Sequence, residues 1–371
     1  MNEVALFRWL PRLAGRVPWV VLGEWPTPLE RWVIDGREVW VKREGDSSPR
    51  YGGNKIRTLE AWLGHAQASG AKRIWAMGAY GSNHAIATIV HARAIGMDAG
   101  AVVFPQPASE WAFENAGGMI ASRSELMRLR SVVEVPFAGL ALAAGARWSE
   151  TLVARLIGAV ELARGGIVMP PGGATPIGTF GALSAALELA EQIAAGNAPP
   201  PARIVLPVGS TCTTAGLLAG LHVAHVLGAW RWPLPIVHGV RVTPWPVTSH
   251  ALTVALAART LARLAALGGP RVEAPFRELG RRLVIDGREI GAGYGRITPR
   301  AEAAMSALGA TSGAPRLDGV YSGKAAAALL RLHARGVGPL VFWATKSTVQ
   351  VDAPSVDALH AAPRALVRWL G

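Results

Sequence analysis

Short apolar runs alternate with helical patterns along the first half of the chain. The apolar runs have the length of buried strands, and the stretches between them repeat apolar residues at helical spacing. The strand-like runs are 39–43, 73–77 and 99–104. One helical stretch spans 82–95, and three others begin near Lys55, near Trp111 and near Trp148. Such alternation predicts parallel sheets with crossover helices.

A second series of the same kind follows. It comprises a strand at 167–169, a glycine turn at 172–173, a helix over 179–194, a strand over 204–208 and a helix from about Ala215, with a proline loop at 199–201. We predict an α/β protein with two open, twisted, parallel-type domains and an active site in the interdomain cleft. The larger domain comprises 1–56 and 171–371, and the smaller mobile domain comprises 57–170.

Composition narrows the class of protein. Half of the residues are hydrophobic and 17% are charged, which argues against extensive disorder. The formal charge of +13 would suit a nucleic-acid partner, but the basic residues are scattered singly, so that function is set aside as the third choice. A single cysteine, Cys212, and the absence of an uninterrupted apolar span predict a cytoplasmic protein with no secretory leader and no membrane helix.

Three strand-to-helix junctions carry candidate chemistry. Gly52-Gly53-Asn54-Lys55 delivers one of only five lysines to the mouth of a helix, where the helix dipole favours the neutral amine that Schiff-base chemistry requires. Gly81-Ser82-Asn83-His84 opens another helix at a ligand-binding position of α/β sheets, although Ser82 and Asn83 would also serve as ordinary helix caps. A lysine in a surface turn is the corresponding plain reading of the first motif.

The third junction is Gly209-Ser210-Thr211-Cys212-Thr213-Thr214. Backbone amides, hydroxyls and a helix dipole converge there, which suits a phosphate dianion, with plain capping as the alternative. The loop lacks the lysine of a P-loop, so a phosphorylated cofactor fits better than a nucleotide.

Two tyrosine motifs and one histidine pair remain. Gly293-Tyr294-Gly295 and Leu317-Asp318-Gly319-Val320-Tyr321-Ser322-Gly323-Lys324 each offer a phenol that acts as an acid, a base or a structural hydrogen-bond donor. His222 and His225 lie three residues apart, but no carboxylate-rich motif accompanies them, so no metal is predicted.

Together, the order and spacing of these segments resemble the fold type II, or tryptophan synthase β-like, enzymes that use pyridoxal 5′-phosphate (PLP). Within them, the chain is similar to the group of 1-aminocyclopropane-1-carboxylate (ACC) deaminase and D-cysteine desulfhydrase. The likeness covers nearly the whole chain, through Pro26-Thr27-Pro28-Leu29, Lys42-Arg43-Glu44, Gly52-Gly53-Asn54-Lys55, Pro171-Gly172-Gly173, the loop at Gly209 and Tyr321-Ser322-Gly323-Lys324.

The resemblance implies a role for each candidate residue. Lys55 matches the lysine that forms the Schiff base with PLP, Asn83 matches the asparagine that bonds the cofactor's phenolic oxygen, and Ser322 occupies the place beside the pyridine nitrogen. The loop of Ser210, Thr211, Cys212, Thr213 and Thr214 matches the phosphate cradle. Tyr294 and Tyr321 match two active-site tyrosines, and Ser82, Asn83, His84 and Tyr321 are expected to contact the substrate.

The same resemblance favours one activity. ACC deaminases carry a glutamate where this chain has Ser322, whereas D-cysteine desulfhydrases carry Ser or Thr, and Thr345 also matches the desulfhydrases. We therefore expect α,β-elimination from D-cysteine or a β-substituted D-alanine, giving pyruvate, ammonia and sulfide or another leaving group, in a homodimer.

Departures from the family pattern keep other activities open. Gly81, Thr58, Lys346 and Ser347 replace the residues usual at those positions, and Thr211 and Cys212 stand where the cradle usually has glycine. ACC deamination, β-replacement, epimerisation and a PLP-binding protein without turnover are the alternatives.

Overall fold

The computed structural model describes residues 4–131, 134, 166–273, 276–311 and 313–371. Its contacts divide the chain into two compact units, of which unit 1 comprises Met1–Trp62 and Ala174–Val349 and unit 2 comprises Leu63–Gly173 and Gln350–Gly371. The predicted domains differ mainly in counting the last residues with the larger domain, whereas Trp369 packs on Tyr80 and Phe113 of unit 2. As functional domains, 1–56 with 171–371 and 57–170 stay a prediction.

Unit 1 is built on a six-stranded sheet. Its strands follow the order β1-β2-β10-β7-β8-β9 and are parallel, except that β1 and β2 pair antiparallel. The strands are β1 (Leu29–Ile34), β2 (Arg37–Arg43), β7 (Arg203–Val208), β8 (Ile236–Arg241), β9 (Leu283–Asp286) and β10 (Leu340–Ala344). The β1–β2 hairpin was not predicted, although Asp35-Gly36, both with positive φ, form the two-residue turn that favours one.

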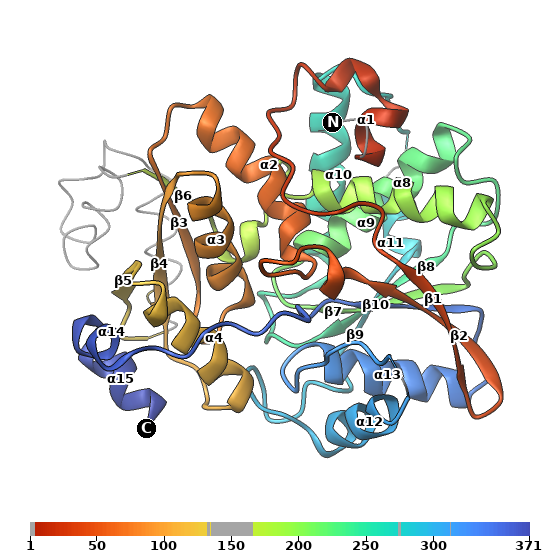
Figure 1. Cartoon of the computed structure of the whole chain (residues 1–371). Coiled ribbons are helices and arrows are strands. Elements are labelled where there is room, and N and C mark those ends of the chain that lie inside the picture. The colour runs from red at the N-terminus through yellow and green to blue at the C-terminus, as the bar shows by residue number, and fades with distance from the viewer. Residues whose placement is uncertain (1–3, 132–133, 135–165, 274–275, 312) are drawn as a thin grey trace. The chain divides into compact units, whose positions relative to one another are not determined.

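Helices cover both faces of this sheet (Figure 1). Because side chains alternate across a strand, Ile204 and Leu206 of β7 enter a core with α1, α8, α9 and α10, while Val205 enters a second core with α12 and α13. The helices are α1 (Ala5–Trp9), η1 (Pro11–Leu13), η2 (Glu44–Asp46), α2 (Lys55–Ala68), α8 (Phe180–Ala194), α9 (Cys212–Val226), α10 (His250–Ala266), α11 (Phe276–Arg281), α12 (Pro299–Gly309) and α13 (Ser322–Ala334).

Unit 2 has a four-stranded parallel sheet in the order β5-β4-β3-β6. The strands are β3 (Arg73–Ala79), β4 (Asp98–Phe104), β5 (Glu125–Arg128) and β6 (Ile167–Val168). The helices are α3 (Asn83–Ala94), α4 (Glu110–Ala121), η4 (Pro171–Gly173), α14 (Val356–Ala361) and α15 (Arg364–Leu370).

Most of the predicted elements are present. The strand-like runs at 39–43, 73–77, 99–104 and 204–208 all lie within strands, and the helices near Lys55, over 82–95, near Trp111 and over 179–194 are confirmed. The helix expected from about Ala215 instead begins at Cys212. The helix expected near Trp148 lies outside the described residues.

Candidate active site

Lys55 is the first residue of α2 and follows the glycine turn predicted to present it. Gly53 has φ +102°, and a Cβ there would lie 2.8 Å from the backbone oxygen of Thr345, so this turn requires glycine. The Asn54 amide donates to the same oxygen at 3.4 Å. The loop before α2 is therefore held against the carboxyl end of β10.

The amine of Lys55 is prepared for nucleophilic chemistry. The side chain is partly buried, and burial lowers the pKa of Lys55 against the opposing effect of nearby Cys212. No residue in the described part of the chain hydrogen-bonds or ion-pairs with Lys55 Nζ. Desolvation without a carboxylate partner shifts a lysine toward the neutral amine, which is the form that attacks a carbonyl carbon.

The loop between β7 and α9 lies beside this lysine. Thr213 Oγ1 accepts a hydrogen bond from Asn54 Nδ2 at 2.8 Å, which joins the two junctions. Thr211 has φ +67°, a conformation that glycine adopts easily and a β-branched residue adopts at a cost. The loop thus keeps a left-handed residue even though the glycine usual in the resembled family is missing.

The early start of α9 changes how its first residues contribute. Cys212, Thr213 and Thr214 occupy its first turn, where backbone N–H groups lack partners within the helix. Thr214 is buried and Ser210 is partly exposed. Thr211, in its left-handed conformation, is the N-cap of this helix and lies three residues after the end of β7.

Two departures from the family pattern contact each other. Cys212 Sγ lies 3.7 Å from Thr58 Oγ1, and both side chains are fully buried. Burial raises the pKa of Cys212, an effect that nearby Lys55 opposes. The structure leaves no solvent-exposed place for a charged lysine at position 58, because the Thr58 side chain is enclosed beside this thiol.

The two predicted tyrosines form a pair. The Tyr294 and Tyr321 hydroxyl oxygens are 2.7 Å apart, and their rings meet edge to face at 6.0 Å. Burial raises the pKa of Tyr294 to about 12, and burial also raises the pKa of Tyr321 well above its usual value. Both phenols therefore stay protonated near neutral pH and can act as hydrogen-bond donors.

The tyrosine pair lies at the loop before α9. A Cβ on Gly209 would be 3.2 Å from the Tyr321 ring, so the aromatic ring packs directly on the backbone of that loop. Lys324 Nζ donates to the backbone oxygens of Ile290 at 2.9 Å and Gly293 at 3.2 Å, which fixes the segment that carries Tyr294. The structure thus assembles Lys55, the hydroxyl loop and both tyrosines within unit 1.

Asp318 organises the start of α13. The sequence motif contains this residue, but no role was predicted for it. Its carboxylate accepts from the backbone N–H groups of Val320 at 3.0 Å and Tyr321 at 2.6 Å. Ser322 Oγ donates to Asp318 Oδ2 at 2.9 Å, and Ser322 is fully buried. The sequence feature that indicates this capping role is an aspartate three residues before Tyr321, the N-cap of α13. The predicted role of Ser322 beside the cofactor ring stays a prediction.

The unusual segment after β10 packs on the turn that carries Lys55. Ser347 Oγ accepts from the Gly52 amide at 2.9 Å. Lys346 is buried, with Nζ 5.9 Å from the centre of the Tyr51 ring. These departures therefore support the turn before α2.

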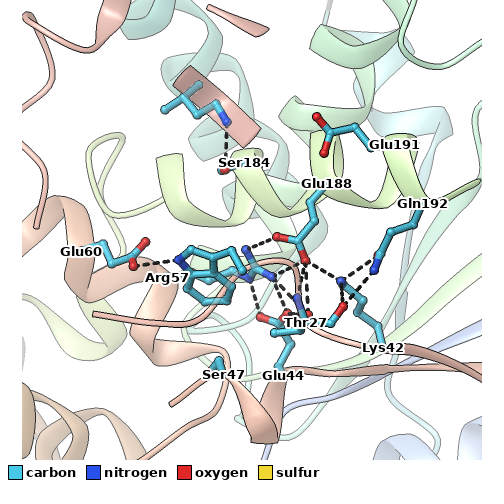
Figure 2. Close-up of polar contacts among 12 residues, drawn as sticks. Thr27, Lys42, Glu44, Ser47, Arg57, Glu60, Ser184, Glu188, Glu191 and Gln192 are labelled. Atoms are coloured by element: carbon cyan, nitrogen blue, oxygen red, sulfur yellow. Dashed lines mark hydrogen bonds and ion pairs between the residues drawn. The ribbon is translucent and has the colours of Figure 1, made fainter. Parts of the chain in front are cut away.

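A buried ionic cluster fixes α2 directly after Lys55 (Figure 2). Arg57 binds the Glu44 carboxylate at 2.7 and 2.8 Å and the Glu188 carboxylate at 2.9 and 3.1 Å. Lys42 binds Glu188, and Thr27 bonds both carboxylates. The members, which we call the Arg57 cluster, are Thr27, Lys42, Glu44, Arg57, Glu188 and Gln192.

Unit 2 carries the remaining predicted residues at the start of α3. Ser82 is the N-cap, and its Oγ accepts from the Ala85 amide at 3.2 Å, so the capping interpretation holds for this hydroxyl. Asn83 Oδ1 accepts from Asn115 Nδ2 at 2.9 Å. His84 is buried in the first turn of the same helix.

The histidines weighed as metal ligands have other contacts. His222 is buried and its Nδ1 donates to the Leu218 backbone oxygen at 2.9 Å, while His225 Nδ1 bonds the Trp230 backbone oxygen at 3.2 Å. Across the part of the chain that the structure describes, no helix has the length and apolar character needed to cross a membrane.

Comparison with known proteins identifies the class that this fold and site define. Residues 20–341 match the family model described as pyridoxal-phosphate dependent enzyme. The chain belongs to this family of PLP-dependent enzymes, and its fold is the tryptophan synthase β-like fold.

Individual relatives carry different names. A nocardicin C-9′ epimerase of Nocardia uniformis subsp. tsuyamanensis is 34% identical over 90% of this chain and 94% of its own length. A D-cysteine desulfhydrase of Serratia proteamaculans is 28% identical over 90% of this chain and 93% of its own length. A solved ACC deaminase homologue aligns with TM-score 0.69 and 26% identity over 96% of this chain and 99% of that structure.

The residues of unit 1 fit PLP. A phosphate needs donors, and the first turn of α9 supplies backbone N–H groups beside the hydroxyls of Ser210, Thr211 and Thr213. An aldehyde reacts with a neutral amine, and the lowered pKa of Lys55, with no partner for its Nζ among the described residues, shifts this side chain toward that form. When bound, PLP withdraws electrons from the α-carbon of an attached amino acid and so acidifies its α-proton.

Proposed function

We propose that the chain removes the α-proton of a small amino acid and then eliminates a group from its β-carbon, as in a D-cysteine desulfhydrase. The observation that carries the proposal is Lys55, a desolvated amine without a carboxylate partner among the described residues, beside the hydroxyl-rich start of α9. This arrangement would hold a cofactor phosphate close to a reactive amine.

Two sets of side chains would share the proton transfers. Lys55 accepts the α-proton once its amine is free, because its lowered pKa favours the neutral form. With D-cysteine, the Cβ–S bond breaks and hydrosulfide leaves, hydrogen-bonded by the Tyr294 and Tyr321 hydroxyls. The hydrosulfide takes the proton that Lys55 removed from the α-carbon, and hydrolysis yields pyruvate and ammonia beside the hydrogen sulfide. In this proposal the start of α3, with Ser82, Asn83 and His84, binds the substrate carboxylate.

Epimerisation is the second candidate. The observation that favours it is the epimerase relative, which is 34% identical across nearly its whole length. The first step is the same, but a phenol would return a proton to the opposite face of the α-carbon and no bond to the β-carbon would break. ACC deamination, β-replacement and a PLP-binding protein without turnover stay open, as do the predicted homodimer and the predicted cytoplasmic location.

One experiment separates these outcomes. The PLP-loaded protein is incubated in D₂O with D-cysteine, and separately with D-alanine, which has no leaving group. Sulfide and pyruvate from D-cysteine would support elimination, whereas deuterium at Cα with inverted configuration and no pyruvate would support epimerisation. The control variant Lys55→Ala should lose both the visible band of the lysine-bound cofactor and the exchange of the α-proton. A wild-type protein that binds PLP but exchanges no α-proton refutes the proposed function.

A further inference from the structure

The side chain of Gln106 fills a space beside the loop between β3 and α3. Gln106 follows β4 in unit 2, and 9% of its surface is exposed. Its Oε1 accepts a hydrogen bond from the Gly81 amide at 3.2 Å. A Cβ on Gly81 would lie 2.5 Å from the Ala112 Cα and 3.0 Å from Gln106 Nε2, so this close approach requires glycine at position 81.

The orientation of the Gln106 amide follows from its partner. Only Oε1 can accept the Gly81 N–H, which leaves the Nε2 group as a donor. Within the described ranges, no residue accepts a hydrogen bond from Nε2, and this nitrogen keeps some contact with solvent. Gln106 Nε2 is therefore a donor that has no protein acceptor in the described ranges, on a side chain that is nine-tenths buried, and it is available to an acceptor on a ligand.

The surroundings of Nε2 favour an anion. Gly81 lies two residues before α3, a helix of 12 residues whose N-terminus carries a partial positive charge. Arg128 places a full positive charge on the side chain of the residue before Gly81, because its Nε donates to Tyr80 Oη at 2.7 Å. Asn115 donates to the Gly81 backbone oxygen at 2.9 Å, so the loop that would receive the ligand is held from both sides.

The C-terminal segment keeps Gln106 in place. Trp369 Nε1 donates to the Gln106 backbone oxygen at 2.9 Å. The Trp369 ring meets the rings of Tyr80 and Phe113 edge to face, each at 5.1 Å. Trp369 of the last helix, α15, therefore contacts both Tyr80, which precedes Gly81, and Gln106, which bonds the Gly81 amide.

We propose that Gln106 is a substrate-binding residue whose Nε2 donates to the carboxylate of the amino-acid substrate at the start of α3. This inference rests on the proposed function, because it takes the anion to be the carboxylate of an amino acid. It adds a residue that the sequence motifs did not contain.

The test uses the PLP-loaded protein and two ligands that differ only at the carboxylate. D-Alanine carries the carboxylate and D-alaninamide lacks it, and both are titrated while the absorption of the bound cofactor is followed. Gln106→Glu keeps an acceptor for the Gly81 amide but replaces the donor with a second carboxylate oxygen. Gln67→Glu makes the same change at an exposed position of α2 and is the matched control.

We expect Gln106→Glu to weaken D-alanine binding about tenfold or more, with little change for D-alaninamide or for PLP. Gln67→Glu should leave all three affinities unchanged. Equal losses for D-alanine and D-alaninamide, or a loss confined to PLP, would overturn the proposal. If Gln106→Glu lowers the melting midpoint of the apoprotein, Gln106→Met decides, because it removes the donor, together with the acceptor for the Gly81 amide, without adding charge.

The binding role of Gln106 and the proposed reaction can be refuted independently of each other. A wild-type protein that exchanges no α-proton but still prefers D-alanine to D-alaninamide through Gln106 refutes the reaction and keeps the binding role. A wild-type protein that exchanges the α-proton, with Gln106→Glu and Gln106→Met unchanged in ligand preference, refutes the binding role and keeps the reaction.

Discussion

Replacing Arg57 with methionine tests whether the Arg57 cluster holds the helix that carries Lys55. The cluster pairs two cations, Arg57 and Lys42, with two carboxylates, Glu44 and Glu188, and each of these side chains is at most 3% exposed. Arg57→Met keeps most of the side-chain volume but leaves two buried carboxylates with a single cation. The variant therefore carries an uncompensated buried negative charge.

The expected loss is large. Removing one partner from a buried ion pair costs about 3–5 kcal/mol, because the remaining charge stays out of water. Burial raises the pKa of Glu188, but the ion pairs with Arg57 and Lys42 lower it further, from 4.5 to about 2. The ionised Glu188 carboxylate contributes to the free energy of unfolding above pH 4.5, and this contribution is lost as the pH falls toward about 2. The difference between wild type and variant should therefore narrow as the pH falls through this range.

Urea denaturation of the apoprotein, followed by circular dichroism at neutral and acidic pH, measures both effects. Arg8→Met is the matched control, since the Arg8–Glu191 pair makes the same charge change with side chains 34% and 30% exposed, and it should cost at most about 1 kcal/mol. A loss below about 1 kcal/mol for Arg57→Met, or a difference that widens in acid, would refute the reasoning.

Two further variants test other parts of the structure. Glu60 is buried and accepts four N–H groups, and burial raises its pKa from 4.5 to about 7 against those bonds. The folded state therefore binds the Glu60 proton more tightly than the unfolded state. As the pH rises from 4.5 to about 7, the free energy of unfolding should fall by about 3 kcal/mol at most. Glu60→Gln should remove this pH dependence. An equal slope in both proteins contradicts this. Trp369→Phe keeps an aromatic ring but loses the hydrogen bond to the Gln106 backbone oxygen. This variant should bind D-alanine about threefold to tenfold more weakly, with no change in its affinity for PLP. Titrations with D-alanine and with PLP measure the two affinities.

The sequence by itself determined the local framework of the site. Gly53 adopts a positive φ, Lys55 opens α2, and Ser82 caps α3, all as the residue types favour. These features depend on the conformational preferences of a few consecutive residues, so they are visible in the pattern of turns and apolar runs. The cofactor was predicted from the family resemblance, which rests on the order and spacing of such junctions along the chain.

The tertiary structure decided which of these junctions meet. Asn54 bonds Thr213 across 159 positions, and Arg57 bonds Glu188 across 131 positions. α9 begins at Cys212, three residues earlier than predicted, after the left-handed N-cap Thr211. None of these partners is specified by its own neighbours in sequence.

The use of Gln106 in unit 2 has the same origin. It approaches Gly81 only because β3 and β4 are parallel neighbours, whose carboxyl ends lie at one edge of the sheet. Its backbone is then bonded by Trp369, 263 positions further along the chain. Local preferences set where each strand and helix begins, whereas the partners of buried polar groups are selected by packing, since an unsatisfied polar group is costly wherever water is excluded.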